Sequence, residues 1–439
     1  MLGCDIGTLF KVTVAGGSYQ DGLTIHIQGV PPGLTITEEQ IYQDLLLRKP
    51  GQGELTSPRR EPDIPLIFTG TNAADTMPGF TNAFATNGTP FGILIPNLDR
   101  HFEHIEQYQV TNRTPRPGHA SYASYQKYGH WDDAIGAGIF SGRYTSTIVA
   151  AGVVAKVILA LHGIEVTAYV KEAAGVIAPE VPIEKIREMA KAYRQIRKEH
   201  DPIWNFVYKE GRIKPGMRFL EKTPVLAEVE RMIGKFPPVP MDEARVRKEY
   251  GVHPSLFCPD LATADEMVRK IIEIKEAGDS SGGLVEVVAT GVPAGLGEPV
   301  FKKLDGELGR MMSIGAVKAV EIGEGLRVKD ITGYECNDQM TADGKKNVIF
   351  KSNHAGGITG GLTTGQTIVA RLAVKPTPTI SKDQETIDKV DRTASVLKAV
   401  TRRDPTLVAR IWPVAEAFTA MILVDHLIMH KGYQAMWQQ

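Results

Sequence analysis

The sequence has few cysteines, almost no net charge and no long uninterrupted apolar run. Its three cysteines, Cys4, Cys258 and Cys336, are odd in number and far apart, with neither a disulfide pattern nor the spacing of metal ligands. A net charge of −1 gives no field that would attract nucleic acid or an anionic membrane. The most apolar stretch, residues 148–161, contains Lys156 and is too short to span a bilayer. The chain also starts without a leader pattern of charged, apolar and small residues, so we expect a cytoplasmic protein without a metal site.

The composition is typical of a soluble globular protein. Of the 439 residues, 42% are hydrophobic and 23% are charged, which is enough apolar material for a sizeable core. This length allows two or three average domains or one large α/β unit. The 44 glycines favour tight turns and close approaches of the backbone to a ligand.

Periodic patterns predict a mixture of strands and helices. Apolar and polar residues alternate over 10–14 and 23–27, which predicts a hairpin with one buried face. Thr37 and Gln40 form a capping box, so we expect a helix to start after Thr37. Further strands are expected at 91–96, 284–289, 316–322 and 368–374, and further helices at 145–161, 183–200, 241–250, 265–277, 300–312 and 414–430.

Two segments depart from this regular pattern. Residues 111–142 are rich in glycine, histidine and tyrosine but have little periodicity, so we expect a long, ordered and functional loop. Residues 183–253 combine charged, helix-forming runs with a proline-rich connector and lack the glycine fingerprint of a dinucleotide-binding unit. We expect them to form helices with charged, solvated faces.

Several glycine- and proline-rich motifs occur in a fixed order along the chain. They include Arg116-Pro117-Gly118-His119-Ala120, the eleven-residue run Gly291–Phe301, Asn353-His354-Ala355-Gly356-Gly357, Lys375-Pro376-Thr377-Pro378-Thr379 and Pro413–Ala417. One short glycine motif is weak support for a function, but this many colinear segments are specific. The chain resembles the chorismate synthase family, and the resemblance covers most of its length.

The resemblance implies both a fold and a reaction. The fold would be of the α/β class (α+β type), a β-α-β sandwich formed by one domain over 1–439 and assembled as a homotetramer. The family's spacing before Cys258 is shorter, so residues 183–253 would be a helical insertion that caps the active site or extends an oligomer contact. Enzymes of the family convert 5-enolpyruvylshikimate 3-phosphate (EPSP) to chorismate by a 1,4-elimination of phosphate that needs reduced FMN. Because no flavin reductase module is visible, the reduced flavin would come from an external flavin reductase.

The resemblance also implies a flavin site. Lysine and threonine side chains suit the flavin phosphate, and glycines let the backbone approach the ring. The matching positions are Ser141, Gly315, Ala316, Gly360, Lys375, Thr377, Thr379 and Arg402. His119 would serve the reduced flavin as the catalytic imidazole, and Asp404 would handle a proton near flavin N5.

Departures from the family motifs fall in the segments expected to line the substrate pocket. Ser18 of the family's GESHG motif is kept, but Tyr19 stands at its histidine, and a phenol with a pKa of about 10 cannot supply a positive charge. Glu54 stands at an arginine position, and Ile139 at another. The candidate substrate-binding residues are Arg48, Arg59, Arg116 and Arg143, together with Trp131 and Tyr144 at an arginine and a glutamate position. Ser18, Ser141 and Tyr19 join His119 and Asp404 as candidate catalytic residues.

These departures leave three functions open. The first is chorismate synthase itself with an unusual site. The second is a paralogous FMN-dependent lyase or dehydratase with a less anionic substrate, whose pocket Tyr19, Trp131, Phe140 and Tyr144 would line. The third is a non-catalytic flavin-binding homologue. In each case the expected partner is a small cyclic acid or its phosphate. We expect binding to neither nucleic acid nor a membrane.

Overall fold

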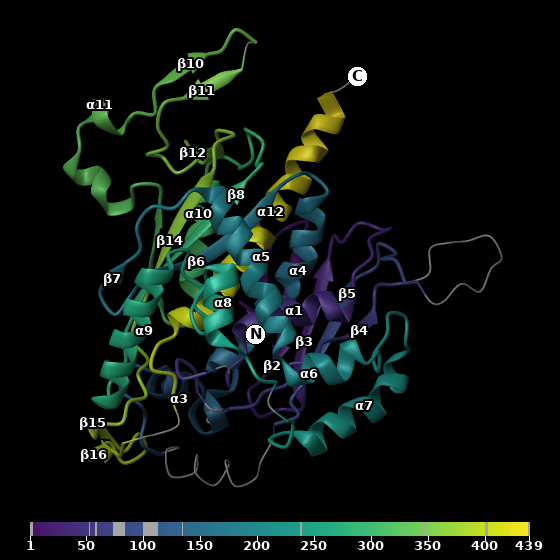
Figure 1. The fold of residues 1–439 in the computed structure, drawn as a ribbon, viewed down its shortest axis with the longest axis vertical. Coiled ribbons are helices and arrows are strands. Elements are labelled where there is room, and N and C mark those ends of the chain that lie inside the picture. Colours follow the sequence, from purple (N-terminus) through teal and green to yellow (C-terminus); the bar gives the residue numbers. More distant parts are fainter. Residues whose placement is uncertain are drawn as a thin grey trace, which may run out of the picture.

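Two antiparallel sheets enclose a layer of helices in the computed structural model (Figure 1). This arrangement confirms the predicted α+β sandwich. The structure describes residues 3–51, 53–57, 59–72, 84–99, 113–133, 135–237, 239–345, 347–399 and 403–437.

The first sheet is built around the predicted N-terminal hairpin. Its strand order is β1 (Asp5–Ile6), β2 (Lys11–Gly16), β3 (Gly22–Gln28), β5 (Phe91–Pro96) and β4 (Leu66–Thr69). Val12 and Ile27 face each other across β2 and β3, and both are buried. Successive side chains of a strand point to opposite faces, so the alternating pattern buries one face against the helices.

The second sheet has the order β7 (Val176–Ile177), β6 (Glu165–Ala173), β8 (Gly283–Thr290), β14 (Ile368–Val374) and β9 (Val317–Ile322). Three of its strands, β8, β9 and β14, were predicted from the sequence, whereas β6, which lies between β7 and β8, was not. All of its strand pairs are antiparallel. The carboxyl end of β14 leads directly into Lys375 and the candidate phosphate-binding residues after it.

The helical layer consists mainly of α1 (Glu38–Arg48), α4 (Thr145–Ala160) and α12 (Val408–Trp437). The capping box of Thr37 and Gln40 starts α1 as predicted. Helices α4 and α12 pack closely at Gly152, where a Cβ atom would lie 2.3 Å from the Cβ of Ala417. Only glycine permits this approach, because real Cβ contacts are much longer.

Two of these helices are long and apolar enough to cross a membrane by length and composition alone: Gly142–Ala160 and Val408–Trp437. Their most apolar windows are 78% and 94% buried inside the protein. A helix that is apolar on all sides is expected at the centre of a large soluble core. The burial therefore accounts for both helices as core elements.

A buried ion network joins the helices of the core. Lys156, which interrupts the most apolar stretch of the sequence, contacts Asp44 and lies 2.7 Å from Glu416 Oε1. Arg194 also contacts Glu416, and Glu416 Oε2 accepts a hydrogen bond from the backbone of Ala168. The charged residue in an apolar run is thus satisfied by acidic partners from α1 and α12, which Arg194 of α5 shares.

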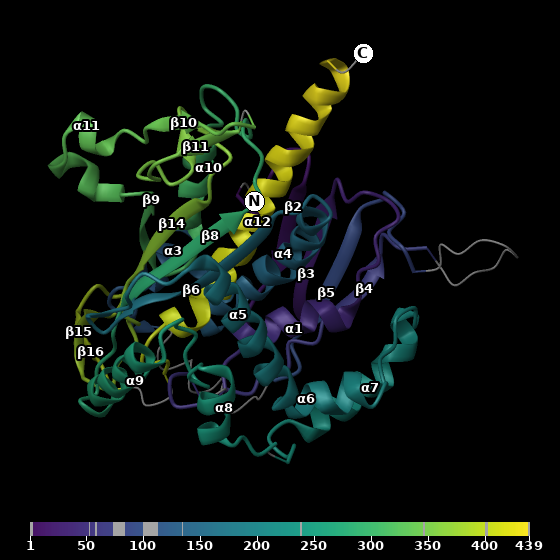
Figure 2. The same cartoon turned by 45° about the horizontal axis from the view of Figure 1, so that its top comes forward.

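Residues 183–253 form helices that pack on one side of the first sheet and α1 (Figure 2). The segment contains α5 (Ile183–Glu199), α6 (Pro202–Trp204), the π-helix η4 (Asn205–Lys209), α7 (Phe219–Met232) and α8 (Glu243–Tyr250). A second hydrophobic cluster joins Val207 and Val229 of this segment to Tyr42, Leu46 and Leu66 of the main body. The proline-rich connector expected from the sequence in fact contains α7, with Pro224 inside it.

The remaining elements complete the chain, and α9 and α10 add buried residues to the core. The expected loop 111–142 contains a helix, α3, in its described part, and the helix expected over 300–312 is shorter. These elements are α3 (Ser121–Tyr128), η1 (Gly129–Trp131), η2 (Ile135–Phe140), η3 (Gly142–Tyr144), α9 (Leu261–Glu276), α10 (Leu304–Gly309), η5 (Arg310–Ser313), η6 (Gly325–Asp330), α11 (Gly333–Cys336), β10 (Met340–Ala342), β11 (Val348–Phe350), β12 (Ile358–Thr359), β13 (Leu362–Thr363), β15 (Gln384–Ile387) and β16 (Ala394–Leu397). Both views show α11, β10 and β11 projecting from the same end of the body as the carboxyl end of α12, at a distance from it (Figures 1 and 2).

Candidate functional site

The turn after β2 carries Ser18 against the start of α4. Ser141 Oγ donates to Ser18 Oγ at 3.3 Å. Asn97 Nδ2 donates to the carbonyl oxygens of Gly17 (2.9 Å) and Ser18 (3.3 Å), and Arg143 Nε donates to Asn97 Oδ1 at 2.5 Å. Two predicted serines and a predicted arginine are thus brought together, through an asparagine that the sequence analysis did not single out.

Four charged side chains form a buried cluster beneath this turn. Arg48 lies 2.8 Å from Asp63 and 3.5 Å from Glu61, and Arg143 lies 3.0 Å from Glu61 and 3.1 Å from Asp63. All four side chains are less than 9% exposed. Burial by itself would raise the pKa of Glu61, but the neighbouring Arg143 and Arg48 outweigh it and lower that pKa to about 2. Arg48 and Arg143 therefore act within this cluster as positioning groups, with their charges already compensated.

Asp404 anchors the loop that leads into the charged cluster. Its Oδ1 accepts from the backbone N–H of Ser57 at 2.6 Å, and its Oδ2 accepts from Arg410 Nη1 at 2.8 Å. Arg410 Nε in turn donates to the carbonyl oxygen of Arg48 at 2.8 Å. Both carboxylate oxygens of Asp404 therefore have partners. Through Arg410, the start of α12 is connected to the end of α1.

Tyr144 connects the Ser141 turn to the second sheet. Its hydroxyl donates to the carbonyl oxygen of Ser313 at 2.9 Å and accepts from the N–H of Gly315 at 3.1 Å. The next residue, Ala316, has φ = 74°, a left-handed conformation that favours glycine, and its carbonyl accepts from the N–H of Lys375 at 2.9 Å. Such strained positions often occur at functional sites.

His119 lies beside the loop that follows β14. Lys375 Nζ donates to the carbonyl oxygen of Gly118, and Arg116 Nη1 lies 3.5 Å from Thr379 Oγ1. Arg116 Nη2 lies 3.1 Å from Nε2 and 3.3 Å from Nδ1 of His119. Residues more than 250 positions apart in the sequence therefore meet at one place, as the motif resemblance predicted.

The environment of His119 keeps its imidazole neutral. Burial, followed by the positive charges of Arg116 and Lys375, lowers the pKa of His119 to about 3. The N–H of Ser121 donates to His119 Nδ1 at 3.1 Å. A bound anion would offset the two cations and raise the pKa of His119, so the ring can gain a proton when such a ligand is present.

The residues around Lys375 fit a phosphate group. Thr377 Oγ1 is buried and has no hydrogen-bond partner among the described residues. Lys318 is close enough to lower the pKa of Lys375, after the larger effect of burial. A Cβ atom at Gly315 would meet no atom within 4 Å, so space remains beside this backbone. An unsatisfied hydroxyl and two lysines suit an anionic oxygen.

Other predicted residues lie apart from this cluster or outside the described residues. Gly360 turns the β12–β13 hairpin beside the loop 291–297, beyond the opposite end of β14 from Lys375. The Trp131 side chain is 93% exposed, so it lines no pocket in this chain, contrary to expectation. Arg59 lies at the edge of the charged cluster, 3.8 Å from Glu61. Arg402 lies outside the described residues.

Several of the groups that hold the site together belong to no motif recognised in the sequence. Asn97, Asp63, Arg410 and Lys318 were not identified as candidates. Asn97 directly follows a predicted strand and Lys318 lies inside one, but the sequence has no signal that pairs any of the four with its distant partners. Among the residues that the structure describes, no group of three or more His, Cys, Asp or Glu side chains could hold a metal ion.

Comparison with known proteins gives one consistent result. The family model described as chorismate synthase matches residues 10–428. A protein of Acetivibrio thermocellus named chorismate synthase is 37% identical over 99% of this chain and 97% of its own length. One of Methanocella arvoryzae with the same name is 37% identical over 98% of this chain and 95% of its own length. A solved structure titled "Crystal Structure of Chorismate Synthase" covers 97% of this chain and 94% of its own, with a TM-score of 0.61 and 24% identity, and supports the fold.

Proposed function

The chain belongs to the chorismate synthase family, and we propose on that basis that it is a carbon–oxygen lyase that eliminates phosphate from EPSP to form chorismate. The observation that carries the proposal is the continuous path of contacts from Ser18 and Ser141, through Tyr144 and Gly315, to Lys375 and His119. Only the folded chain brings these family motifs together.

Reduced FMN is the cofactor that the site would hold. Lys375, Lys318 and Thr377 would bind its phosphate, and the open backbone at Gly315 and Ala316 would lie against its ring. The chemistry that reduced FMN supplies when bound is transient electron density, which lets phosphate leave before the weakly acidic ring hydrogen is lost. Arg402 and Gly360, where the family has flavin contacts, remain part of this proposal only by resemblance.

The side chains of the site divide the proton handling between them. His119 is neutral without ligand and would gain a proton at the imidazole once anionic groups bind, because its depressed pKa comes from burial and two cations. The hydroxyls of Ser18, Ser141 and Tyr19 would donate hydrogen bonds to the departing phosphate. A hydroxyl donates without positive charge, so we expect Tyr19 to be weaker in this role than an imidazolium.

The charged cluster would position the substrate turn. Arg143 holds Ser18 through Asn97, and Glu61 and Asp63 hold Arg143 in place. Asp404 fixes the neighbouring loop through Ser57, from where it could act on the flavin. Direct binding of substrate anions would fall to Arg116 and Arg59, which are less buried than Arg48 and Arg143.

The structure offers little to the alternative of a less anionic, aromatic pocket. Trp131 is 93% exposed and Phe140 is 42% exposed. Tyr144 directs its hydroxyl to Ser313 and Gly315. These aromatic residues therefore do not assemble into a common pocket in this chain. Elimination of phosphate from EPSP is the better-supported function.

We further propose a cytoplasmic homotetramer supplied with reduced flavin by an external reductase. The projecting arm of α11, β10 and β11 exposes Tyr334, Met340 and Val348, and the end of α12 exposes Met436 and Trp437. Exposed apolar groups gathered on projecting elements favour a contact with another copy of the chain. A sedimentation measurement that finds only monomer at micromolar concentration would remove this proposal.

The function is tested by anaerobic turnover. Protein mixed with dithionite-reduced FMN and EPSP should release phosphate and form chorismate in equal amounts, and oxidised FMN should support neither. His119→Asn should lower kcat by about 100-fold or more, the usual scale for loss of general acid–base catalysis. His162→Asn, at an exposed position, is the matched control. Absence of chorismate although reduced FMN binds would refute the proposed reaction.

A further inference from the structure

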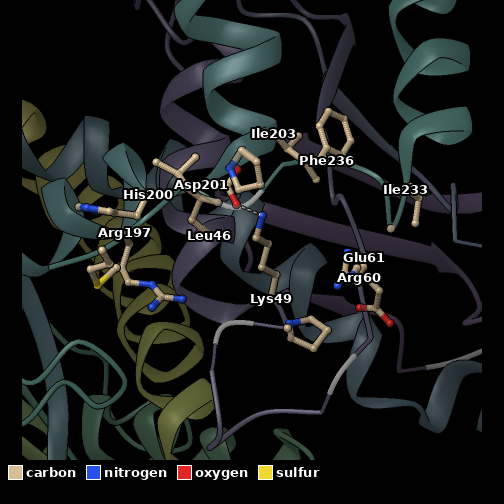
Figure 3. Close-up of a pocket in the computed structure, with 16 residues that line it drawn as sticks. Leu46, Lys49, Arg60, Glu61, Arg197, His200, Asp201, Ile203, Ile233 and Phe236 are labelled. Carbon is tan, nitrogen blue, oxygen red and sulfur yellow. Dashed lines mark hydrogen bonds and ion pairs between the residues drawn. The ribbon is translucent and has the colours of Figure 1, made fainter. Parts of the chain in front are cut away.

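A cavity lies between the helices of 183–253 and the main body, beside the loop that follows α1 (Figure 3). Its volume is about 400 Å³, within the range of small-molecule sites. One wall comes from Leu46, at the end of α1, and Lys49, just after it. Facing residues come from α5, α6 and the chain after α7. The cavity therefore exists only because the segment 183–253 packs against the body.

Most of the cavity surface is apolar. Ile203, Phe236, Val239 and Met241 from the 183–253 segment face Leu46 of the body across it. None of these side chains needs a polar partner. Apolar surface around a space of this size favours a ligand with an apolar body, such as a ring or a short hydrocarbon chain.

The charged groups at the cavity make it suited to an anion. Its two acids are already engaged, because Asp201 pairs with Lys49 and Glu61 pairs with Arg143 and Arg48. Arg60 and Arg197 add positive charge to the lining. Arg60 is exposed to solvent and forms no ion pair or hydrogen bond with the residues that the structure describes. A carboxylate could bind there without displacing an existing buried pair.

The cavity is separate from the proposed catalytic cluster. Glu61 is the one residue of the charged cluster that also lines the cavity, and Ser18, His119 and Lys375 do not line it. Glu61 therefore forms a physical connection between the cavity and Arg143, which positions the Ser18 turn through Asn97. Lys49 and Asp201 hold the 183–253 segment against the end of α1 at the same place.

We propose that this cavity is a binding site for a small organic monoanion with an apolar body, distinct from the EPSP and flavin site. The carboxylate lies at Arg60 and the apolar body lies against Phe236, Val239 and Leu46. Because the site spans the 183–253 segment and the loop that carries Glu61, its occupancy would join the two parts more firmly. This inference does not depend on the catalytic reaction.

Fluorescence titration with 8-anilinonaphthalene-1-sulfonate, an anion with an aromatic body, tests the site in the full-length protein. We expect saturable binding of one probe per chain and displacement by 3-phenylpropionate. The uncharged 3-phenylpropionamide should displace the probe at least tenfold less well, because it lacks the charge that Arg60 recognises. EPSP should not displace the probe.

Variants locate the binding. Arg60→Gln should weaken probe binding about tenfold, and Val239→Trp, which fills the cavity, should abolish it. Arg269→Gln, on the exposed face of α9, is the matched control and should bind as the unaltered protein does. Probe binding that survives both cavity variants would overturn the proposal, as would displacement by EPSP or a probe that does not saturate. Circular dichroism establishes that each variant is folded.

Discussion

Replacing Glu61 by glutamine should destabilise the protein strongly, since Glu61 is the shared partner of Arg48 and Arg143. The substitution keeps the size of the side chain but removes its charge, leaving two buried guanidinium groups with Asp63 alone. Removing one member of a buried ion pair typically costs about 3–5 kcal/mol. The pKa of Glu61 gives an independent figure: a fall from 4.5 to about 2 corresponds to roughly 3 kcal/mol of stability at neutral pH. The two approaches agree.

The same pKa predicts how the effect depends on pH. The folded protein holds the Glu61 carboxylate ionised below the pH at which the unfolded chain takes up a proton. This contribution to stability is therefore complete above about pH 4.5 and is lost as the pH falls toward 2. At pH 3.5 about 1.4 kcal/mol of it should be gone, by the same linkage relation. The stability difference between the unaltered protein and Glu61→Gln should shrink by that amount.

Urea unfolding followed by tryptophan fluorescence measures this difference at pH 7 and pH 3.5. Trp412 is fully buried, so its emission should report unfolding of the core. Glu210→Gln is the control, because Glu210 forms only a surface pair with Arg212 and should change the free energy of unfolding by less than about 1 kcal/mol. Equal stability of the Glu61 variant and the unaltered protein at pH 7, or a difference independent of pH, would contradict the reasoning about the cluster.

Three further predictions concern the proposed catalytic site. Tyr19→His should raise kcat by about tenfold or more in anaerobic turnover, since a charge-assisted bond to phosphate is worth about 1.5–3 kcal/mol; an unchanged or lower kcat would mean that residue 19 does not serve the leaving group. Lys375→Met should weaken binding of reduced FMN about tenfold or more, whereas Lys351→Met on the exposed arm should leave it unaltered. Equal affinity of the Lys375 variant and the unaltered protein for reduced FMN would remove Lys375 from the phosphate site. Arg116→Gln should raise the pKa of His119 above about 3 in an NMR titration of the ligand-free protein, although burial, the largest cause, and Lys375 remain. An unchanged pKa would exclude Arg116 as a cause of the shift.

Elements with a strong local signal were predictable from the sequence. The strand over 368–374 agrees with β14 at both ends, and the capping box at Thr37 identified the start of α1. The helix α7 was missed because Pro224 lies inside it and argued against a helix in that stretch. Helix α3 was missed because few of its side chains are buried, so its sequence has no apolar stripe. For α7, packing of Leu226 and Val229 against the main body outweighs the local preference against a helix.

The candidate site was predictable in its motifs and less so in its contacts. The resemblance groups His119 with Lys375 and Thr379, and the fold places these residues near one another, which no local rule predicts. It also assigned Arg48 and Arg143 to the substrate, whereas both point into the charged cluster with Glu61 and Asp63. Side-chain direction depends on the packed neighbours of each residue, and one sequence contains no signal for those neighbours. Trp131 failed as a pocket residue for the same reason.

A crystal structure of the protein with FMN and EPSP tests the central claim most directly. The account predicts the flavin phosphate at Lys375, Thr377 and Thr379, the ring beside His119 and Ala316, and the EPSP phosphate next to Ser18. Flavin bound elsewhere, for example in the cavity lined by Phe236 and Leu46, would contradict it.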